Sequence, residues 1–276
     1  MRRISAPGLC LGLCVGLAAA ALGQTRDAPI PHTSGQSISP AYEGWYPNPD
    51  GTFTLSFGYF NRNYEERLDI PIGAGNRFEP GPADRGQPTH FLPRRHTGVF
   101  TVTVPADFGE QRLRWHVTAN GKTYSVAGHL RPEWRIDVLR EVTSGNTPPT
   151  VRFAPDGEPG QGPTGIRTQL QARAGAPVEL ALWAVDDGVR TFVRSSRPPT
   201  LGLVWSKFRG PGQVSFSETE PGVDEGDRAV TTATFDTPGD YVLRVLAWDD
   251  SGPQGYTMAV GFQCCWTNAY VHVGVQ

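Results

Sequence analysis

The sequence predicts an all-β protein with two antiparallel β-sandwich domains, and three observations lead to this prediction. The 276 residues include 33 Gly and 25 Pro. No stretch between them exceeds about a dozen residues, so helices of ordinary length have almost no room. Short segments in which apolar and polar residues alternate recur between these breaks, as in half-buried strands. The length also suits two domains of ordinary sandwich size.

The first residues are typical of an export signal. Met1-Arg2-Arg3 is positively charged, residues 9–22 form an apolar run, and Gly23 ends a stretch of small residues. The run is short for a bilayer span, and no later segment is apolar enough to cross a membrane. We expect a signal peptide at residues 1–23, no transmembrane segment after its cleavage, and a periplasmic or extracellular (secreted) protein.

The charge balance argues against nucleic acid as a partner. The chain has 25 Lys and Arg against 27 Asp and Glu, and cleavage after Gly23 removes Arg2 and Arg3 but no acid. The mature chain is therefore more acidic than the full sequence. Since phosphate binding needs a net basic face, we expect no nucleic acid partner.

The first domain is predicted at residues 39–140, after a polar, Pro-rich leader at 24–38 that we expect to be flexible. Asn120-Gly121 is a strong two-residue hairpin signal between two alternating runs. Gly73–Thr97, rich in Pro, Gly and Arg, is predicted to be a long irregular loop. The strand candidates are Thr52–Phe60, Leu68–Ile72, Val99–Val104, Leu113–Ala119, Thr123–Leu130 and Trp134–Leu139.

Residues 141–149 (EVTSGNTPP) predict a linker, and residues 150–276 a second sandwich. A tight turn at Thr237–Asp240 contains Pro and Gly, which favour the turn conformation. A Tyr directly after such a turn, here Tyr241, fits the tyrosine corner of immunoglobulin-like (Ig-like) sandwiches. The strand candidates are Val178–Val185, Leu201–Phe208, Val214–Phe216, Ala229–Phe235, Tyr241–Trp248 and Ala269–Val275.

Four motifs of this second half follow one another in a familiar order. They are PPT at Pro148–Thr150, APVELALWAVDDG at Ala176–Gly188, LVWSKFRGPGQVSF at Leu203–Phe216 and TTATFDTPGDYVLRVLAWDD at Thr231–Asp250. Together they resemble the PKD (polycystic-kidney-disease) repeat and related Ig-like modules of secreted bacterial proteins. The resemblance covers most of Pro148–Gln276 and implies a spacer or adhesion module without catalytic residues. The first domain resembles uncharacterised secreted bacterial proteins.

The second half also departs from the PKD pattern. The loop at Val189–Pro199 is basic, Glu218–Arg228 is long and acidic, and Gly255–Asn268 is inserted before the last strand. The insertion carries Cys264 and Cys265. In an exported protein they are oxidised where geometry permits, but a regular strand points adjacent side chains to opposite faces. Three interpretations stay open: a vicinal disulfide in a kinked turn, two free thiols, or a thiolate pair for a soft metal.

Carboxylates follow two predicted strands that end at the same side of an Ig-like sandwich. Asp186 and Asp187 follow one strand, and Asp249 and Asp250 follow the other. Four carboxylates within reach of one another would suit Ca²⁺, the one cofactor that the sequence suggests. Ordinary turn chemistry of Asp is the alternative. The inserted loop would bring Trp266, a binding candidate, to the same end.

The sequence carries no catalytic signature. It lacks G-x-S-x-G, H-E-x-x-H and a P-loop, and the G-x-G-x-x-G match at Gly160–Gly165 lies in a Gly/Pro-rich loop without a βα context. Glu65, Glu66 and Asp69 could act as acid or base, but neighbouring surface acids are usually just solvated. The six histidines show no ligand spacing. We therefore expect a protein that is not an enzyme.

Aromatic and basic side chains are the remaining binding candidates. Trp45 and Tyr46, if exposed, could stack on a sugar or on an apolar patch of a protein, although packing in the core is the alternative. Arg94 and Arg95 lie side by side and could pair with an anionic partner, or form a solvated basic loop.

These observations predict an exported, non-catalytic binding or structural protein, used for adhesion or as a spacer. Its sandwich loops would recognise a protein or glycan partner in the cell envelope. One alternative is a carbohydrate-active or hydrolytic accessory protein, with an aromatic-lined cleft around Trp45, Tyr46, Glu65 and Asp69. A second alternative is a metal or redox role at Cys264–Cys265.

Overall fold

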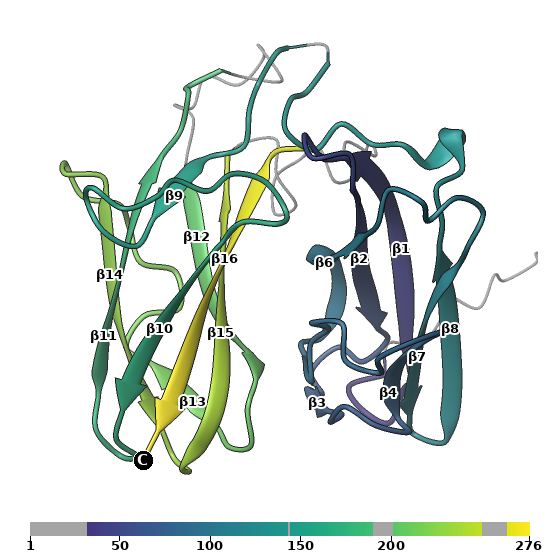
Figure 1. The fold of residues 1–276 in the computed structure, drawn as a ribbon. Helices are drawn as coiled ribbons and strands as arrows, with labels where there is room; N and C mark the ends of the chain where they lie inside the picture. Colours follow the sequence, from purple (N-terminus) through teal and green to yellow (C-terminus); the bar gives the residue numbers. More distant parts are fainter. Residues whose placement is uncertain (1–31, 143, 190–200, 250–263) are drawn as a thin grey trace, which may run out of the picture. The chain divides into compact units, whose positions relative to one another are not determined.

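The computed structural model describes residues 32–142, 144–189, 201–249 and 264–276 (Figure 1). Within these ranges the regular structure is β, apart from one 3-10 turn, η1 (Pro132–Trp134). The first strands are β1 (Ile38–Pro47), β2 (Phe53–Asn61), β3 (Leu68–Asp69), β4 (Asn76–Glu79), β5 (His90–Phe91), β6 (Arg94–Val104), β7 (Leu113–Ala119) and β8 (Lys122–Gly128). The later strands are β9 (Thr150–Arg152), β10 (Ile166–Ala172), β11 (Val178–Val185), β12 (Gly202–Arg209), β13 (Val214–Phe216), β14 (Arg228–Phe235), β15 (Gly239–Trp248) and β16 (Trp266–Val275). The all-β prediction is confirmed, and the predicted signal peptide lies outside the described residues.

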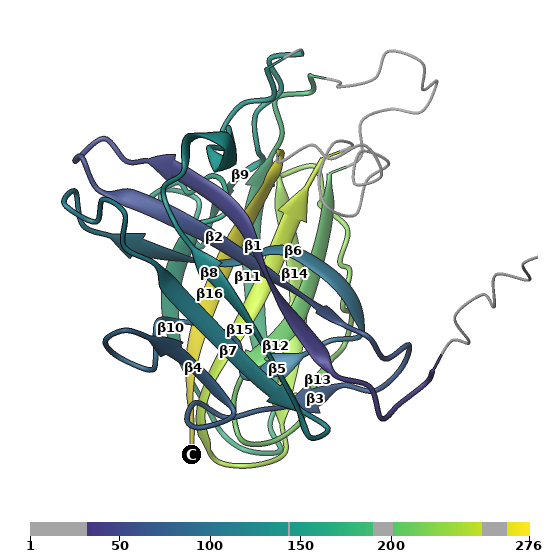
Figure 2. The ribbon, with the colours of Figure 1, turned by 90° about the vertical axis from the view of Figure 1, so that its right-hand side faces the viewer.

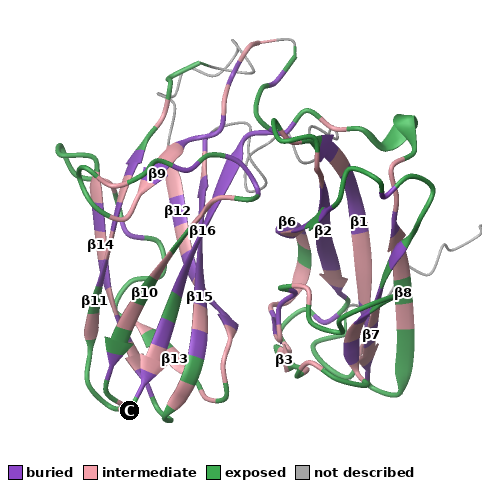
Figure 3. Cartoon of the chain, viewed as in Figure 1, coloured by how far each residue is buried: buried purple, intermediate pink, exposed green. Residues whose placement is uncertain are grey.

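The N-terminal strands form two three-stranded sheets around an aromatic core. One sheet has the order β1-β2-β6 and the other β4-β7-β8, while β3 pairs with β5. Phe57 of β2 and Trp115 of β7 are fully buried and meet edge to face, with ring centroids 6.2 Å apart. The indole N–H of Trp115 donates to Asn76 Oδ1 at 2.9 Å, so this buried polar group is satisfied. Figure 3 shows in purple the long buried stretches of the strands.

The C-terminal strands form two four-stranded sheets in the order of an Ig-like sandwich. One sheet has the order β13-β14-β11-β9 and the other β10-β16-β15-β12, which can be followed in Figure 2. All pairs are antiparallel except β10 with β16. The order β9-β11-β14-β13 matches the ABED layer of a constant-type Ig domain and β12-β15-β16 its CFG layer, to which β10 adds a parallel edge strand. Leu182 of β11, Trp205 of β12 and Leu243 of β15 belong to the buried core between the layers. The prediction of an Ig-like sandwich is confirmed.

The tyrosine corner predicted at Tyr241 is confirmed. The phenol donates to Thr237 O at 2.7 Å and accepts from the backbone N–H of Gly212 at 3.0 Å, and the residue is 1% exposed. The preceding turn contains Gly239 at a φ of +143°, a value that L side chains rarely adopt. Tyr241 therefore ties the corner between β14 and β15 to the loop that follows β12.

We expect Tyr241→Phe to lower the free energy of unfolding by about 1–2 kcal/mol, because the variant leaves the N–H of Gly212 and the carbonyl of Thr237 without their partner. Urea denaturation of the mature protein measures this loss. Tyr64→Phe is the matched control, since Tyr64 is 48% exposed. An equal loss in both variants would contradict a role for the corner.

Some predicted element boundaries are wrong. The predicted irregular loop Gly73–Thr97 contains β4, β5 and the start of β6, because β4 pairs with β7 although Gly and Pro flank it. The predicted strand Trp134–Leu139 is instead the end of η1 followed by chain that makes one bridge, from Arg135 to Trp45. Strands β1, β9 and β10 were not predicted. In β1 the register shifts at Gly44, and such a bulge interrupts the alternation of side chains.

The end of the predicted flexible leader, residues 24–38, is held in place from residue 32. Asn63 donates from Nδ2 to the carbonyl of Gln36 at 3.0 Å, and its Oδ1 accepts from the N–H of Gln36 at 2.6 Å. Asn63 is itself fully buried. The Asn63 side chain therefore satisfies the backbone N–H and carbonyl of Gln36, as a neighbouring strand would.

The predicted linker, residues 141–149, also packs against the rest of the protein. Glu141 and Asn146 are buried, and the N–H of Glu141 donates to the carbonyl of Asn146 at 2.7 Å. Contacts group His32–Gln276 into one compact unit, and the predicted domain boundaries stay predictions. Within the part of the chain that the structure describes, no helix has the length and apolar character of a membrane span.

Side chains of β12 and β16 contact the N-terminal sandwich, and we call this contact the junction. Asn268 donates from Nδ2 to the carbonyl of Gly98 at 2.9 Å, and the phenol of Tyr270 donates to Val99 O at 2.8 Å. Tyr270 and Phe208 are buried together with the aromatic core of the N-terminal sandwich. The outward face of the β12-β15-β16 sheet is therefore a buried surface at the junction.

Candidate functional site

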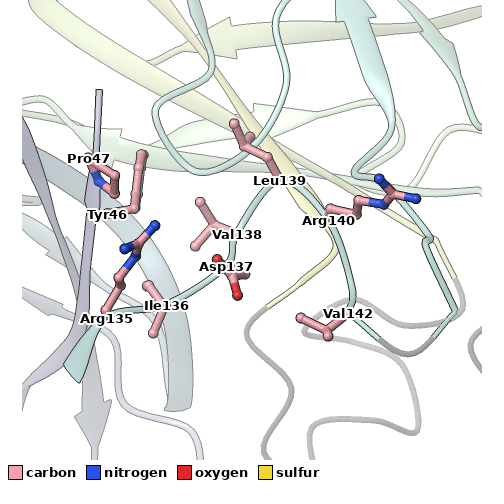
Figure 4. A pocket seen from close by; sticks show the side chains of 9 residues that line it. All are labelled: Tyr46, Pro47, Arg135, Ile136, Asp137, Val138, Leu139, Arg140 and Val142. Atoms are coloured by element: carbon pink, nitrogen blue, oxygen red, sulfur yellow. The ribbon is translucent and has the colours of Figure 1, made fainter. Parts of the chain in front are cut away.

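One of the hollows is an apolar groove of about 490 Å³, which we call the β1 groove. Figure 4 shows its lining, with side chains from the end of β1 on one side and from the segment after η1 on the other. The lining residues are Tyr46, Pro47, Arg135, Ile136, Asp137, Val138, Leu139, Arg140 and Val142.

Two hydrogen bonds fix the two walls of the groove against each other. The N–H of Ile136 donates to the carbonyl of Trp45 at 2.9 Å, and the indole N–H of Trp45 donates to the carbonyl of Arg131 at 2.8 Å. Gly44 makes the close approach possible: it lies at a φ of +131°, and a Cβ there would be 2.6 Å from the carbonyl oxygen of Trp134. The walls therefore form a preformed surface.

The groove combines exposed apolar side chains with charge. Leu139 is 52% exposed and Val142 78%, which is unusual for large apolar residues in neighbouring positions. Arg135 and Arg140 are exposed beside them, with Asp137 between. A surface of this kind suits an apolar side chain of a partner that also carries a negative charge.

Of the predicted aromatic binding residues, Tyr46 lines the groove and Trp45 supports it. Tyr46 is only 9% exposed, and its hydroxyl lies 2.6 Å from Thr164 Oγ1. Burial raises the pKa of Tyr46, and the hydrogen bond with Thr164 partly opposes this. Trp45 is half-buried and packs edge to face on Phe53, with ring centroids 5.5 Å apart. Both rings therefore pack mainly against the protein, as core residues do, and do not form an open platform on which a sugar could stack.

The two predicted basic binding residues lie on β6 and are already engaged. Arg94 stacks on the ring of Tyr64, with the guanidinium carbon 3.8 Å from the centroid. Arg95 forms a two-pronged ion pair from Nη2 to Glu43, with distances of 2.8 and 3.0 Å. Burial raises the pKa of the Glu43 carboxyl, while the charge of Arg95 acts to lower it. Arg95 therefore compensates a buried charge and is not a free partner for an anion.

The acidic side chains proposed as acid or base take part in local bonding. Glu66 Oε2 accepts from the N–H of Gly35 at 2.7 Å. Asp69 Oδ1 lies 2.8 Å from His90 Nδ1 and 2.9 Å from Lys207 Nζ. Burial acts to raise the pKa of Asp69, but hydrogen bonds from His90 and Lys207 outweigh it and hold that pKa below its usual range.

Calcium binding at the four predicted aspartates stays a prediction, because Asp250 lies outside the described residues. Asp187 Oδ2 accepts from Thr147 Oγ1 at 2.7 Å, and Asp249 Oδ2 accepts from Asn146 Nδ2 at 2.7 Å. In the described ranges, no group of three or more His, Cys, Asp or Glu side chains could hold a metal ion.

Cys264 and Cys265 are joined by a disulfide in the structure, and both are buried. Trp266 does not lie on a projecting loop as predicted: it begins β16 and is 2% exposed. Its ring packs directly against Gly98 of the junction, and this contact takes it out of reach of an external ligand.

No protein-family model and no curated protein matches the sequence. Among solved structures, the chain is similar to the D00-D0 domain of intimin at 10% identity, over 86% of this chain and 99% of that one, with a TM-score of 0.28. It is similar to domains 4 and 5 of the S-layer protein SbsC at 15% identity, over 64% and 70%, with a TM-score of 0.26. Titin Ig tandem domains A164-A165 match at 10% identity, over 87% and 99%, with a TM-score of 0.23. Scores this low support no functional argument. The Ig-like class rests on the strand order and the tyrosine corner.

Proposed function

We propose that this chain is an exported, non-catalytic binding module of the cell envelope that recognises a protein partner through the β1 groove. The observation that carries the proposal is the pair of exposed apolar side chains, Leu139 and Val142, on a segment joined to β1 by a backbone hydrogen bond and by a hydrogen bond from the indole of Trp45. Exposed apolar patches on a fixed support are typical of protein interfaces. The export signal and the PKD-like motifs of the sequence support the envelope location.

The groove favours a peptide segment with a large apolar residue next to an acidic one. Leu139 and Val142 provide the apolar contact, and Arg135 and Arg140 provide the positive charge that a carboxylate would meet. A sugar would need an open aromatic face, and Tyr46 offers little of its ring to solvent. A protein partner therefore fits the lining better than a glycan does.

The contacts at the junction support a structural role for the chain in addition to binding. Hydrogen bonds from Asn268 and Tyr270 reach the N-terminal sandwich and hold the two sandwiches together at the junction. A binding surface carried on such a support transmits load to the rest of the chain, as an adhesion or spacer module must.

A displayed peptide library can be selected for binding to the mature protein. We expect the selected peptides to contain an apolar residue next to Asp or Glu. Leu139→Asp should weaken the selected peptides at least tenfold by titration calorimetry, since one substitution removes apolar contact and adds repulsion. Val185→Asp is the matched control, because Val185 is 41% exposed on β11, away from the groove.

Equal weakening by both substitutions would contradict recognition at the groove, as would selected peptides without acidic residues. Binding of the protein on a glycan array that Leu139→Asp leaves unchanged would favour the carbohydrate alternative instead.

A further inference from the structure

Arg244 of β15 is a buried cation without a carboxylate partner. It lies at the junction and is 6% exposed. Its Nε and Nη2 atoms donate to Asn268 Oδ1 at 2.9 and 2.7 Å. None of the ion pairs among the described residues includes Arg244. An amide oxygen cannot neutralise a guanidinium, which stays charged in proteins and is costly to bury unpaired.

The titratable side chains that interact with Arg244 include two phenols and an imidazole. Burial raises the pKa values of the Tyr59 and Tyr270 phenols. Burial also lowers the pKa of His96 to about 4, with a further contribution from the positive charges of Arg244 and Arg95. Neither the phenols nor the imidazole therefore supplies the missing negative charge at neutral pH.

A cavity of about 290 Å³, which we call the junction pocket, adjoins this cation. Its basic lining side chains are Arg67, His90, His96, Lys207 and Arg244, and no Asp or Glu of the described residues lines it. Lys207 and His90 are already paired with Asp69. The positive charges left to the pocket are those of Arg244 at its buried side and of Arg67, which is exposed.

The rest of the wall mixes apolar side chains with the polar side chains of Ser206, Gln213 and Thr219. Val204, Phe216 and Leu246 line the pocket. Trp205, which is 2% exposed, also lines it, and its indole N–H has no hydrogen-bond partner among the described residues. Trp205 faces the core between the two layers, whereas Arg244 faces the other side of the same sheet, so this orphaned N–H is separate from the buried cation.

We propose that the junction pocket binds a small organic carboxylate, with the carboxylate on Arg244 and the hydrocarbon part against Val204, Phe216 and Leu246. A guanidinium pairs with a carboxylate through two parallel N–H···O bonds. One buried unpaired cation matches one negative charge, and the apolar side chains of Val204 and Leu246, on the same face of the sheet as Arg244, favour a carbon skeleton over a hydrated inorganic anion. This site is separate from the β1 groove and does not depend on the proposed function.

The test uses benzoate as the probe, with benzamide as its neutral analogue and inorganic phosphate as a second anion. Calorimetric titration and thermal unfolding of the mature protein measure binding. We expect benzoate to bind and to raise the Tm by several degrees at saturation, and benzamide and phosphate to have no such effect. Equal binding of benzamide would overturn the proposal, as would stabilisation by phosphate alone or no binding of benzoate.

Two variants test whether benzoate binds in the junction pocket. Arg244→Gln should abolish benzoate binding, because it removes the cation. Should that variant fail to fold, Arg67→Glu tests the same site from its exposed side, and we expect it to weaken benzoate binding at least tenfold. Arg112→Glu is the matched control, since Arg112 is exposed and lines no described pocket. Benzoate affinity that is the same in Arg67→Glu and in Arg112→Glu would overturn the assignment.

Discussion

Arg95→Ala should lower the free energy of unfolding by about 3 kcal/mol at neutral pH, because it leaves the Glu43 carboxylate buried and unpaired. Glu43 has 5% of its side chain exposed against 38% for Arg95. Removal of the Arg95 side chain therefore leaves the Glu43 carboxylate buried, without water to replace the lost partner. Urea denaturation at pH 7 measures the loss.

The pH dependence of that loss identifies its cause. Burial already raises the pKa of Glu43, and removal of Arg95 raises it further. A raised carboxyl pKa means that the folded state binds a proton more tightly than the unfolded state, so stability falls as the pH rises through that range. The loss in Arg95→Ala should therefore be smaller at pH 5 than at pH 7.

The double variant Glu43→Gln with Arg95→Ala provides the control. It removes the buried charge together with its partner and should recover part of the stability. A loss that stays the same at both pH values and in the double variant would mean that Arg95 acts through packing of its side chain, and would contradict the ion-pair explanation.

Gly98→Ala should be the most damaging small substitution at the junction, with a loss of about 3 kcal/mol in the free energy of unfolding. Gly98 has a φ of +55°, and an added Cβ would overlap the ring of Trp266. The same residue accepts the hydrogen bond from Asn268, so a shift of the backbone loses that contact as well. Differential scanning calorimetry measures the change.

Gly51→Ala separates the two causes. Gly51 has a φ of +84°, but nothing lies within 4 Å of the position of its Cβ. It therefore reports the backbone strain alone, and we expect about 1 kcal/mol. If the two variants lose the same stability, then close packing at the junction contributes nothing and the two sandwiches are held by other contacts.

A further ion pair crosses the junction beside these contacts. Arg209 of β12 pairs with Asp84 at 2.7 Å and also donates to the carbonyl of Gln87 at 2.7 Å. Hydrogen bonding with Arg209 holds the pKa of Asp84 below its usual range. Since Asp84 is half exposed, this pair aligns the two sandwiches more than it stabilises them.

The sequence predicted a binding residue on only one wall of the β1 groove. Tyr46 was named as a binding candidate from its aromatic neighbours, and it does line the groove. The opposite wall lies in residues that were predicted as a strand and a linker, because their alternation resembles that of a strand. The hydrogen bond from Ile136 to Trp45 and the close approach at Gly44 place this segment beside β1, and neither contact has a local sequence signal.

By itself, the sequence determined the β class, the tyrosine corner at Tyr241 and most strands of the second sandwich. Those features depend on alternation and on turn residues, which act over a few neighbouring positions. Tertiary structure alone decided which outward faces are covered. Arg244 alternates outward from the core of its own sandwich, as a solvated residue would, yet the other sandwich buries it. The period of a strand says which side a residue takes and nothing about what packs against that side.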